Sequence, residues 1–228
     1  MSTGPRLDVT GDGDGGRRDL SGDRAHAGEL ELVDRVEPRP VVSREVGFHG
    51  RVWDVVSEVV DLGAAGGVTR DYIDHPGAVA VVALDDAGRI ALVHQYRHPI
   101  GTVEWEIPAG LTDVDGEPLV LTAQRELAEE TDLRADTWHH LLEVATTPGS
   151  SSERITIFLA RDLHVVPEAE RHTREGEELD MPLAWFPLDE VRDAALAGRI
   201  RNMTLIAGVL AACAARDAGW STLRSATP

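Results

Sequence analysis

The chain has 228 residues, which fits one domain with appendages or two small domains and is long enough to bury a substantial core. Its 22 Lys and Arg against 40 Asp and Glu leave a net charge of −18, which argues against nucleic-acid binding and against a polybasic membrane-surface module. The single cysteine, Cys213, excludes an internal disulfide and a cysteine zinc site and is typical of a cytoplasmic protein.

Residues 1–40 are predicted to form a solvated acidic, glycine-rich tail. Gly, Asp and Arg crowd the stretch GDGDGGRRDLSGDRAHAG, and its isolated apolar residues cannot offset the entropy lost on ordering it. The residues near Met1 contain no apolar run of the kind that a secretory signal carries. The longest apolar run of the chain, residues 203–215, is too short to cross a bilayer, so we expect no membrane segment.

Residues 41–76 are predicted to form a small antiparallel β segment. Residues 51–61 (RVWDVVSEVVD) are rich in β-branched side chains, and residues 68–74 (VTRDYID) form a second run of this type. The stretch GAAGG between them is typical of a turn. The two runs are therefore expected to pair as a hairpin.

Residues 77–220 are predicted to form the main domain, an α/β (α+β) fold with a mixed β-sheet flanked by helices. The expected strands are residues 78–84, 90–96, 141–146 and 155–160, and the expected helices are residues 118–133, 188–197 and 203–216. The first two strands are apolar enough to be buried on both faces, which the helices would cover. Residues 221–228 are expected to form a short C-terminal tail.

Three glutamates stand out on the first of these helices. Glu126, Glu129 and Glu130 are spaced i, i+3 and i+4, so their carboxylates share one helix face, where like charges destabilise one another. A divalent cation would reverse that effect, because Mg²⁺ and Mn²⁺ prefer hard oxygen ligands. The alternative is a solvated acidic face, which is the commoner arrangement of such glutamates.

The residues around this helix resemble the signature of the Nudix hydrolases, which cleave nucleoside diphosphates linked to another moiety with the help of Mg²⁺ or Mn²⁺. The signature reads G-x5-E-x7-R-E-U-x-E-E-x-G-U, where U is an apolar residue. The matching residues of this chain are Gly110, Glu117, Arg125, Glu126, Leu127, Glu129, Glu130 and Leu133.

Two positions depart from the signature. Six residues instead of five separate Gly110 from Glu117, so the loop before the helix is longer. Asp132 replaces the second glycine, at a place just past a helix end where a left-handed backbone is common. Asp is among the few non-glycine residues that adopt this conformation, and neither departure removes a metal ligand.

The resemblance implies a role for each residue of the cluster. It makes Glu126 and Glu130 the principal metal ligands. It makes Glu129 a catalytic residue that bridges to or binds a second ion, and the carbonyl of Ala109 a backbone ligand. Arg125 would orient the glutamates for catalysis, and its alternative role is that of a surface arginine paired with Glu129.

The likeness extends over roughly residues 50–208 and is nearest to the ADP-ribose pyrophosphatase branch of the family. Pro148 lies sixteen residues after Asp132, where that branch carries a proline. The runs HQYRHPIG (residues 94–101) and WEIPAG (residues 105–110) are also similar. In that branch the N-terminal β segment is exchanged across a homodimer, so the resemblance implies a homodimer here.

The diphosphate of such a substrate needs local positive charge in a chain of net charge −18. Arg97 is the first candidate, because a guanidinium matches phosphate oxygens bidentately, and Arg70 is the second. The alternative for Arg97 is a solvent-exposed arginine at a strand edge. Phe48 and Trp53 would offer an aromatic face for adenine, although packing is the commoner fate of such side chains.

Hydrolysis also needs a general base for the attacking water. Glu153, in the loop after Pro148, resembles the catalytic glutamate found there in bacterial relatives. The rival is the acidic loop that contains Glu175, Glu177 and Glu178, because some relatives keep the base on that later loop. The sequence favours Glu153 only narrowly, since it does not measure which carboxylate reaches the water.

The expected function is Mg²⁺-dependent hydrolysis of ADP-ribose to AMP and ribose 5-phosphate, with Mn²⁺ able to substitute. One alternative keeps this chemistry but acts on an ADP-sugar, another nucleotide sugar or NADH. The other is a non-catalytic ADP-ribose sensor. The complete glutamate cluster and the lack of a basic helix-turn-helix pattern argue against the sensor.

Overall fold

The computed structural model describes residues 31–174 and 181–227, and it divides into two units, residues 1–38 and residues 39–228. Within the first unit, residues 31–38 contain no helix or strand. The rest of that unit, which holds most of the predicted N-terminal tail, lies outside the described residues. The helices and strands described below all belong to the second unit.

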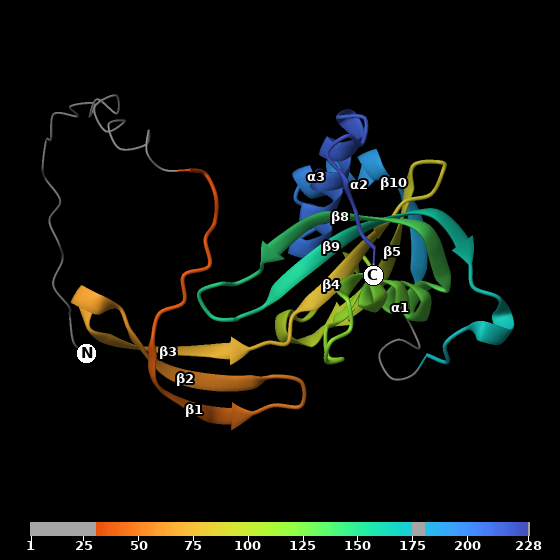
Figure 1. The fold of residues 1–228 in the computed structure, drawn as a ribbon. Helices are drawn as coiled ribbons and strands as arrows, with labels where there is room; N and C mark the ends of the chain where they lie inside the picture. The colour runs from red at the N-terminus through yellow and green to blue at the C-terminus, as the bar shows by residue number, and fades with distance from the viewer. Residues whose placement is uncertain (1–30, 175–180, 228) are drawn as a thin grey trace, which may run out of the picture. The chain divides into compact units, whose positions relative to one another are not determined.

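The predicted β segment is a three-stranded antiparallel sheet of order β1-β2-β3 (Figure 1). Its strands are β1 (Val41–His49), β2 (Asp54–Asp61) and β3 (Gly67–Asp74). The predicted hairpin is confirmed, because β2 and β3 pair along their whole length around a turn at Gly63–Ala65. β1 is an additional strand, and all of its residues are exposed.

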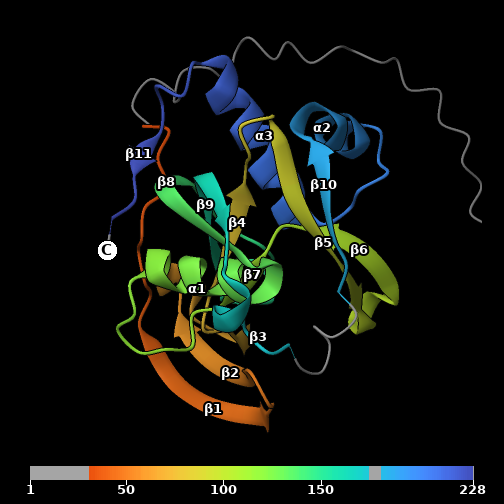
Figure 2. The same ribbon diagram turned by 90° about the vertical axis from the view of Figure 1, so that its right-hand side faces the viewer.

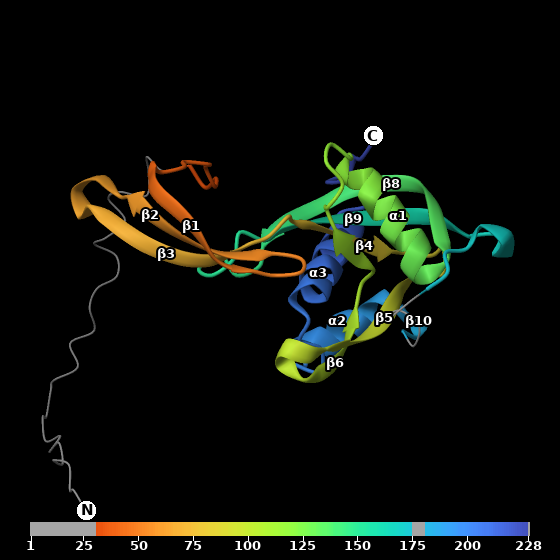
Figure 3. The same ribbon diagram turned by 90° about the horizontal axis from the view of Figure 1, so that it is seen from below.

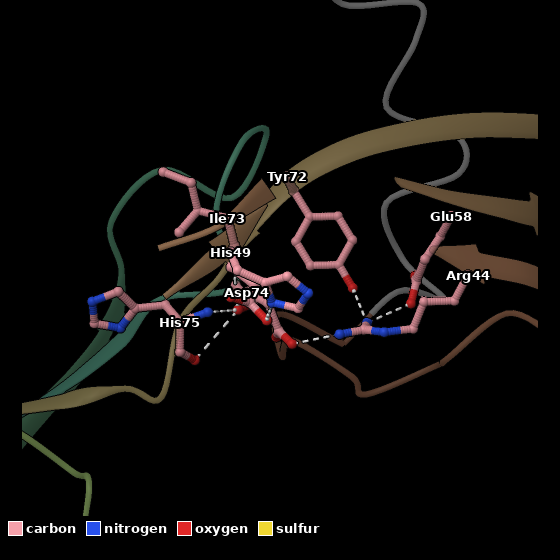
Figure 4. Close-up of polar contacts among 9 residues, drawn as sticks. Arg44, His49, Glu58, Tyr72, Ile73, Asp74 and His75 are labelled. Atoms are coloured by element: carbon pink, nitrogen blue, oxygen red, sulfur yellow. Dashed lines mark hydrogen bonds and ion pairs between the residues drawn. The ribbon is translucent and has the colours of Figure 1, made fainter. Parts of the chain in front are cut away.

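One arginine joins the three strands of this sheet through side-chain contacts. Arg44 of β1 donates hydrogen bonds to Glu58 of β2 at 2.7 Å and to the hydroxyl of Tyr72 of β3 at 3.2 Å (Figure 4). It also forms an ion pair with Asp74 at the end of β3. The hydrogen bonds to Glu58 and Asp74 raise the pKa of Arg44 above its ordinary value. The sheet is therefore joined by charge-assisted bonds.

The main domain contains two further sheets. A five-stranded sheet has the order β11-β8-β9-β4-β7, and a three-stranded sheet has the order β10-β5-β6. The strands are β4 (Ala78–Ala83), β5 (Arg89–Arg97), β6 (Thr102–Glu106), β7 (Ala109–Leu111), β8 (Leu133–Ala145), β9 (Arg154–Val165), β10 (Leu183–Pro187) and β11 (Arg224–Ser225). β4 and β9 are parallel while their other neighbours are antiparallel, which confirms the predicted mixed sheet.

Three helices pack around the sheets, one on each face of the five-stranded sheet and one against a helix and β10 (Figure 2). They are α1 (Leu119–Thr131), α2 (Leu188–Leu196) and α3 (Met203–Asp217). Alternate residues of β4 pack against α1 or against the α2–α3 side, so this strand is buried on both faces and is apolar throughout. Figure 3 shows α1 alongside β4, β8 and β9. No helix in the described residues is long and apolar enough to span a membrane.

The structure differs from the sequence-based expectation at the short or half-exposed strands. β6, β7 and β10 are not predicted, because each is short and lacks a continuous buried run. β8 begins well before the predicted strand at residue 141, since its first half alternates in burial. The expected C-terminal tail, residues 221–228, contains the short strand β11 (Arg224–Ser225). β11 adds to the edge of β8, and Ala226 donates its N–H to the carbonyl of Trp138, which satisfies backbone groups at that edge.

β3 leads directly into the main domain and pairs there with the loop of residues 147–152. Ile73 donates its N–H to the carbonyl of Ser150 at 2.9 Å and accepts from the N–H of Ser152 at 3.0 Å. The Ser152 hydroxyl also accepts a hydrogen bond from the N–H of His75 at 2.8 Å. The loop that carries Pro148 is therefore held by the end of the N-terminal sheet.

The packing of α1 is tested by a pair of leucines on that helix. Leu127 is fully buried, whereas Leu119 is 42% exposed. We expect Leu127→Ala to lower the free energy of unfolding by about 2–5 kcal/mol, because it leaves a cavity beneath the helix. Leu119→Ala is the matched control and should cost less than about 1 kcal/mol. Urea denaturation measures both, and equal losses would contradict the described packing.

Candidate active site

Helix α1 packs one face into the core and presents its glutamates on another. Ala123 and Leu127 are fully buried, as their helical spacing predicts. Glu126 and Glu130 reach across to the backbone of β7. At least two carboxylates of the cluster therefore contact another part of the protein. The alternative, a solvated acidic face, does not require such contacts.

Gly110 of β7 is required by the close approach of Glu126. A Cβ atom at this position would lie 2.0 Å from the carboxylate carbon of Glu126 and 2.3 Å from each of its oxygens. The φ angle of Gly110 is not positive, so the site needs the missing side chain and not an unusual backbone conformation. The first glycine of the signature thus leaves room for a carboxylate.

Ala109 lies next to Glu130, although 21 residues separate them in the chain. The N–H of Ala109 donates a hydrogen bond to Oε2 of Glu130 at 3.1 Å. The sequence assigns Ala109 a role through its carbonyl, and the structure adds that its amide orients one of the predicted ligands.

Arg125 lies among the carboxylates of the cluster. Its Nη1 donates to Oε1 of Glu126 at 2.6 Å and to Oε2 of Glu129 at 3.4 Å. Its Nη2 lies 3.5 Å from Oε2 of Glu117, which also accepts a hydrogen bond from the hydroxyl of Thr122 at 2.8 Å. The geometry therefore contains both the predicted orienting contacts and the alternative i,i+4 pair with Glu129.

The surroundings of Glu126 disfavour the charged form of its carboxyl. Its burial raises the pKa of its carboxyl, the charge of Arg125 opposes the shift, and the charge of Glu129 adds to it, so that the pKa lies above its ordinary value. A cation placed beside Glu126 would relieve both the burial cost and the repulsion.

The donor set fits a hard divalent cation, because it consists of three carboxylates on one helix face beside the half-buried backbone of β7. In the described part of the chain, no three His, Cys, Asp or Glu side chains converge closely enough to hold an ion. Arg125 bonds to Glu126 and Glu129, and Glu130 bonds to a backbone amide. Side-chain rotations at these contacts would gather the oxygens around an ion.

The second departure from the signature has the predicted conformation. Asp132 follows the last turn of α1 with φ 57° and ψ 29°, which is the left-handed region. Its N–H donates to the carbonyl of Ala128 at 3.1 Å and closes the helix. The expectation that Asp can replace glycine at this position is confirmed.

Arg97, at the end of β5, is held by a buried glutamate. Its Nε and Nη2 donate to the two carboxylate oxygens of Glu106 at 2.7 and 2.6 Å. This bidentate pair fixes the plane of the guanidinium, while the Arg97 side chain is 43% exposed, as in the alternative interpretation of a solvent-exposed arginine at a strand edge. Sequence reasoning did not single out Glu106, although it is the one acidic residue of the run WEIPAG.

Arg70 and Pro148, which the sequence identifies separately, border the same cavity. This cavity has a volume of about 430 Å³ and lies between the N-terminal sheet and the loop of residues 147–152. Arg70 also donates to the carbonyl of Thr69 at 2.9 Å. Tyr72 completes the wall on the side of β3.

The two predicted aromatic residues lie near the junction of the sheets. Trp53 stacks on His75 with ring centroids 5.4 Å apart and lines a second cavity of about 340 Å³, together with Arg51. Phe48 of β1 is 65% exposed. Neither ring is buried in the core, so both remain available to a ligand or to another protein surface.

Glu153 lies between the hydroxyl of Thr146 and the ring of His75. The hydroxyl of Thr146 donates to Oε2, and Nε2 of His75 lies 3.4 Å from Oε1. Nδ1 of His75 accepts a hydrogen bond from the N–H of Gly77 at 3.0 Å, which orients the ring so that Nε2 faces Glu153. His75 carries no sequence signal, because its partner is far away in the chain. The rival acidic loop, residues 175–178, lies outside the described residues.

The contact between Gly110 and Glu126 is open to a direct test. We expect Gly110→Ala to weaken divalent-cation binding by about tenfold or more, because the added Cβ would displace a carboxylate. Gly47→Ala is the matched control, since its Cβ would make an ordinary contact 3.7 Å from the carbonyl of Val55. Titration with Mn²⁺ followed by electron paramagnetic resonance measures both. Unchanged affinity in Gly110→Ala would show that Glu126 does not bind the ion.

The raised pKa of Glu126 predicts a pH-dependent stability. A folded-state pKa above the unfolded value means that this carboxyl favours folding below the unfolded pKa and that this contribution is lost as the pH rises through the folded pKa. Glu126→Gln should therefore stabilise the metal-free protein at neutral pH, and the gain should vanish as the pH falls below about 4.5. Urea unfolding in EDTA across this range is the measurement, and a gain that did not change with pH would contradict the assignment.

Comparison with known proteins identifies the family of the chain. The NUDIX domain family model matches residues 74–205. An ADP-ribose pyrophosphatase of Mycobacterium tuberculosis is 45% identical over 170 residues, which cover 75% of this chain and 81% of that protein. An ADP-ribose pyrophosphatase of Bacillus subtilis is 38% identical over 171 residues, covering 72% of this chain and 91% of that protein.

A solved structure described as a crystal structure of an ADP compounds hydrolase has a TM-score of 0.66 to this chain and covers 82% of it and 99% of its own length. At 20% identity this likeness shows a shared fold. The hydrolases of the matched family depend on a divalent metal, for which the glutamates of α1 are suitable ligands. By its fold, its glutamate cluster and its sequence, the chain belongs to the Nudix family of hydrolases.

Proposed function

We propose that this Nudix hydrolase cleaves the diphosphate of ADP-ribose to give AMP and ribose 5-phosphate, with Mg²⁺ as its cation and Mn²⁺ able to substitute. The observation that carries the proposal is the approach of Glu126 and Glu130 of α1 to the backbone of Ala109 and Gly110. The choice of substrate is supported by the names of the relatives from M. tuberculosis and B. subtilis.

The glutamates of α1 are assigned to the metal. Glu126 and Glu130 are the principal ligands, Glu129 binds or bridges to a second ion, and the carbonyl of Ala109 is a backbone ligand. Bound Mg²⁺ would neutralise phosphate charge and lower the pKa of the attacking water. Arg125 keeps the carboxylates oriented through its bonds to Glu126 and Glu129.

Arg97 and Arg70 are assigned to the phosphates. The pair with Glu106 holds the guanidinium of Arg97 in one plane, so its orientation is set before a substrate arrives. Arg70 borders the cavity beside Pro148, where the second phosphate or its ribose would lie. Such local positive charge is needed to draw a dianion to a chain of net charge −18.

Glu153 is assigned as the general base. A carboxylate has about four lone-pair sites, so the hydrogen bond from Thr146 and the contact with His75 leave acceptor capacity for a water. Glu153 would take the proton of the water whose oxygen attacks phosphorus, while the bond from phosphorus to the leaving phosphate oxygen breaks. The acidic loop of residues 175–178 is the rival source of the base.

A homodimer is part of the proposal. β1 is exposed along its whole length, and Val42 and Phe48 on it are 69% and 65% exposed. A second copy of the chain that exchanged its N-terminal sheet would cover this apolar surface and bring Phe48 or Trp53 to the adenine. The single cysteine supports a cytoplasmic location.

Activity on a panel of nucleoside diphosphates tests the substrate. With Mg²⁺, ADP-ribose should give the highest kcat/KM, and chromatography should identify AMP and ribose 5-phosphate as products. A much higher value for an ADP-sugar, another nucleotide sugar or NADH would overturn the choice of substrate and leave the chemistry intact. Binding of ADP-ribose without turnover at saturating Mg²⁺ would favour a sensor.

Three substitutions separate the ligand from the base. Glu130→Gln should abolish most activity, since it removes a ligand charge and little volume. Glu153→Gln should lower kcat by a factor of about 10²–10⁴ and leave KM nearly unchanged, because it removes a proton acceptor. Glu143→Gln, at an exposed glutamate paired with Arg154, is the control and should retain activity. An unchanged kcat in Glu153→Gln would move the base to residues 175–178.

A further inference from the structure

Asp132 has a side chain where the Nudix signature has a glycine, and that side chain makes a specific contact. Oδ2 of Asp132 lies 2.9 Å from Nη2 of Arg174. The two side chains are only 19% and 29% exposed. Oδ1 of Asp132 is buried and has no hydrogen-bond partner among the described residues. Arg174 is thus the cation that balances this largely buried carboxylate.

Arg174 makes a second contact, to the backbone of the acidic helix. Its Nε donates to the carbonyl of Glu129 at 3.2 Å. The last carbonyls of a helix have no partner within the helix, and a cation at this end also opposes the negative pole of the helix dipole. A single guanidinium therefore caps the last turn of α1 and binds the residue that ends it.

The chain on either side of these contacts is fixed independently. The N–H of Val166 donates to the carbonyl of Asp132 at 2.8 Å, directly after β9. Nε of Arg171 donates to the carbonyl of Val166 at 3.2 Å, which closes the segment that leads to Arg174. An ion pair of 2.8 Å between Arg134 and Glu170 links the same segment to β8. These contacts therefore hold the segment that carries Arg174 next to the end of α1.

We propose that Arg174 is a positioning residue for the divalent cation. It acts through Asp132 and through the backbone of Glu129, and it fixes the last turn of α1, on which the carboxylates of Glu129 and Glu130 stand. The proposal rests on the proposed function in one respect, namely that these carboxylates bind the ion. In this chain an aspartate–arginine pair stands where the signature relies on glycine alone.

The effect on ion affinity that the proposal expects from removing Arg174 is opposite in sign to the effect of removing its charge alone. Arg174 is a cation close to a cation site, so removing its charge favours ion binding through the field alone. Loss of positioning works in the opposite direction, because the last turn of α1 and the ligands on it lose their fixed geometry. Weaker binding after removal of Arg174 therefore reports positioning.

The test is Mn²⁺ binding to the full-length, metal-free protein, measured by electron paramagnetic resonance. Arg174→Gln should weaken Mn²⁺ binding by about tenfold, as the loss of a residue that orients metal ligands does. Arg171→Gln is the matched control, because it removes the same charge from the same segment, while the described side-chain bond of Arg171 goes to the carbonyl of Val166 and not to α1, and it should leave affinity unchanged or slightly higher. Arg174→Lys keeps the charge but not the planar fork and should lie in between.

A double-mutant cycle completes the test. Asp132→Gly keeps the left-handed backbone and removes the carboxylate, so it should also weaken binding. The fold-changes of Asp132→Gly and Arg174→Gln should not multiply in the double variant, because both break one contact. Multiplying effects, or unchanged Mn²⁺ affinity in Arg174→Gln with a loss only of urea stability, would overturn the proposal. Absence of Mn²⁺ binding or of ADP-ribose turnover in the unmodified protein would instead overturn the proposed function.

Discussion

The repulsion among three carboxylates on one face of α1 is the constraint around which the site is arranged. An isolated helix would be destabilised by Glu126, Glu129 and Glu130 at these spacings. In the protein, Arg125 donates hydrogen bonds to Glu126 and Glu129, and a backbone amide donates one to Glu130. The apolar face of the same helix anchors it firmly to β4 and β9. Tertiary contacts thus stabilise a cluster of like charges that would destabilise an isolated helix. Such a conflict between local and tertiary preferences is typical of functional sites.

A second set of contacts joins the N-terminal sheet to the substrate side of the main domain. Ile73 of β3 pairs with the loop of residues 147–152, and His75 reaches Glu153 immediately after that loop. The cavity between Arg70 and Pro148 lies on this junction. A shift of β3 would therefore move residues at the proposed phosphate site and at the proposed base together. Neither of these lies on the signature helix.

Some parts of the fold were predictable because their signals are local. The buried strand β4 and the buried half of β9 are continuous apolar runs, and the three helices have regular apolar spacing, so each was predicted close to its observed bounds. The strands β6, β7, β10 and β11 were not, because they owe their pairing to a neighbouring strand and carry little periodicity of their own. β7 matters most among them, since it supplies the backbone that Glu126 and Glu130 approach.

The sequence by itself determined the Nudix resemblance, the three glutamates of one helix face and the left-handed residue at Asp132. These follow from spacing along one helix and from the backbone preferences of single residues, which are properties of a short stretch of chain. Only the tertiary structure decided that Glu106 holds Arg97, that His75 and Thr146 hold Glu153, and that Arg174 caps α1. Each of these pairings joins different strands or loops, so it depends on the path of the chain through space, and no periodicity in the sequence encodes that path.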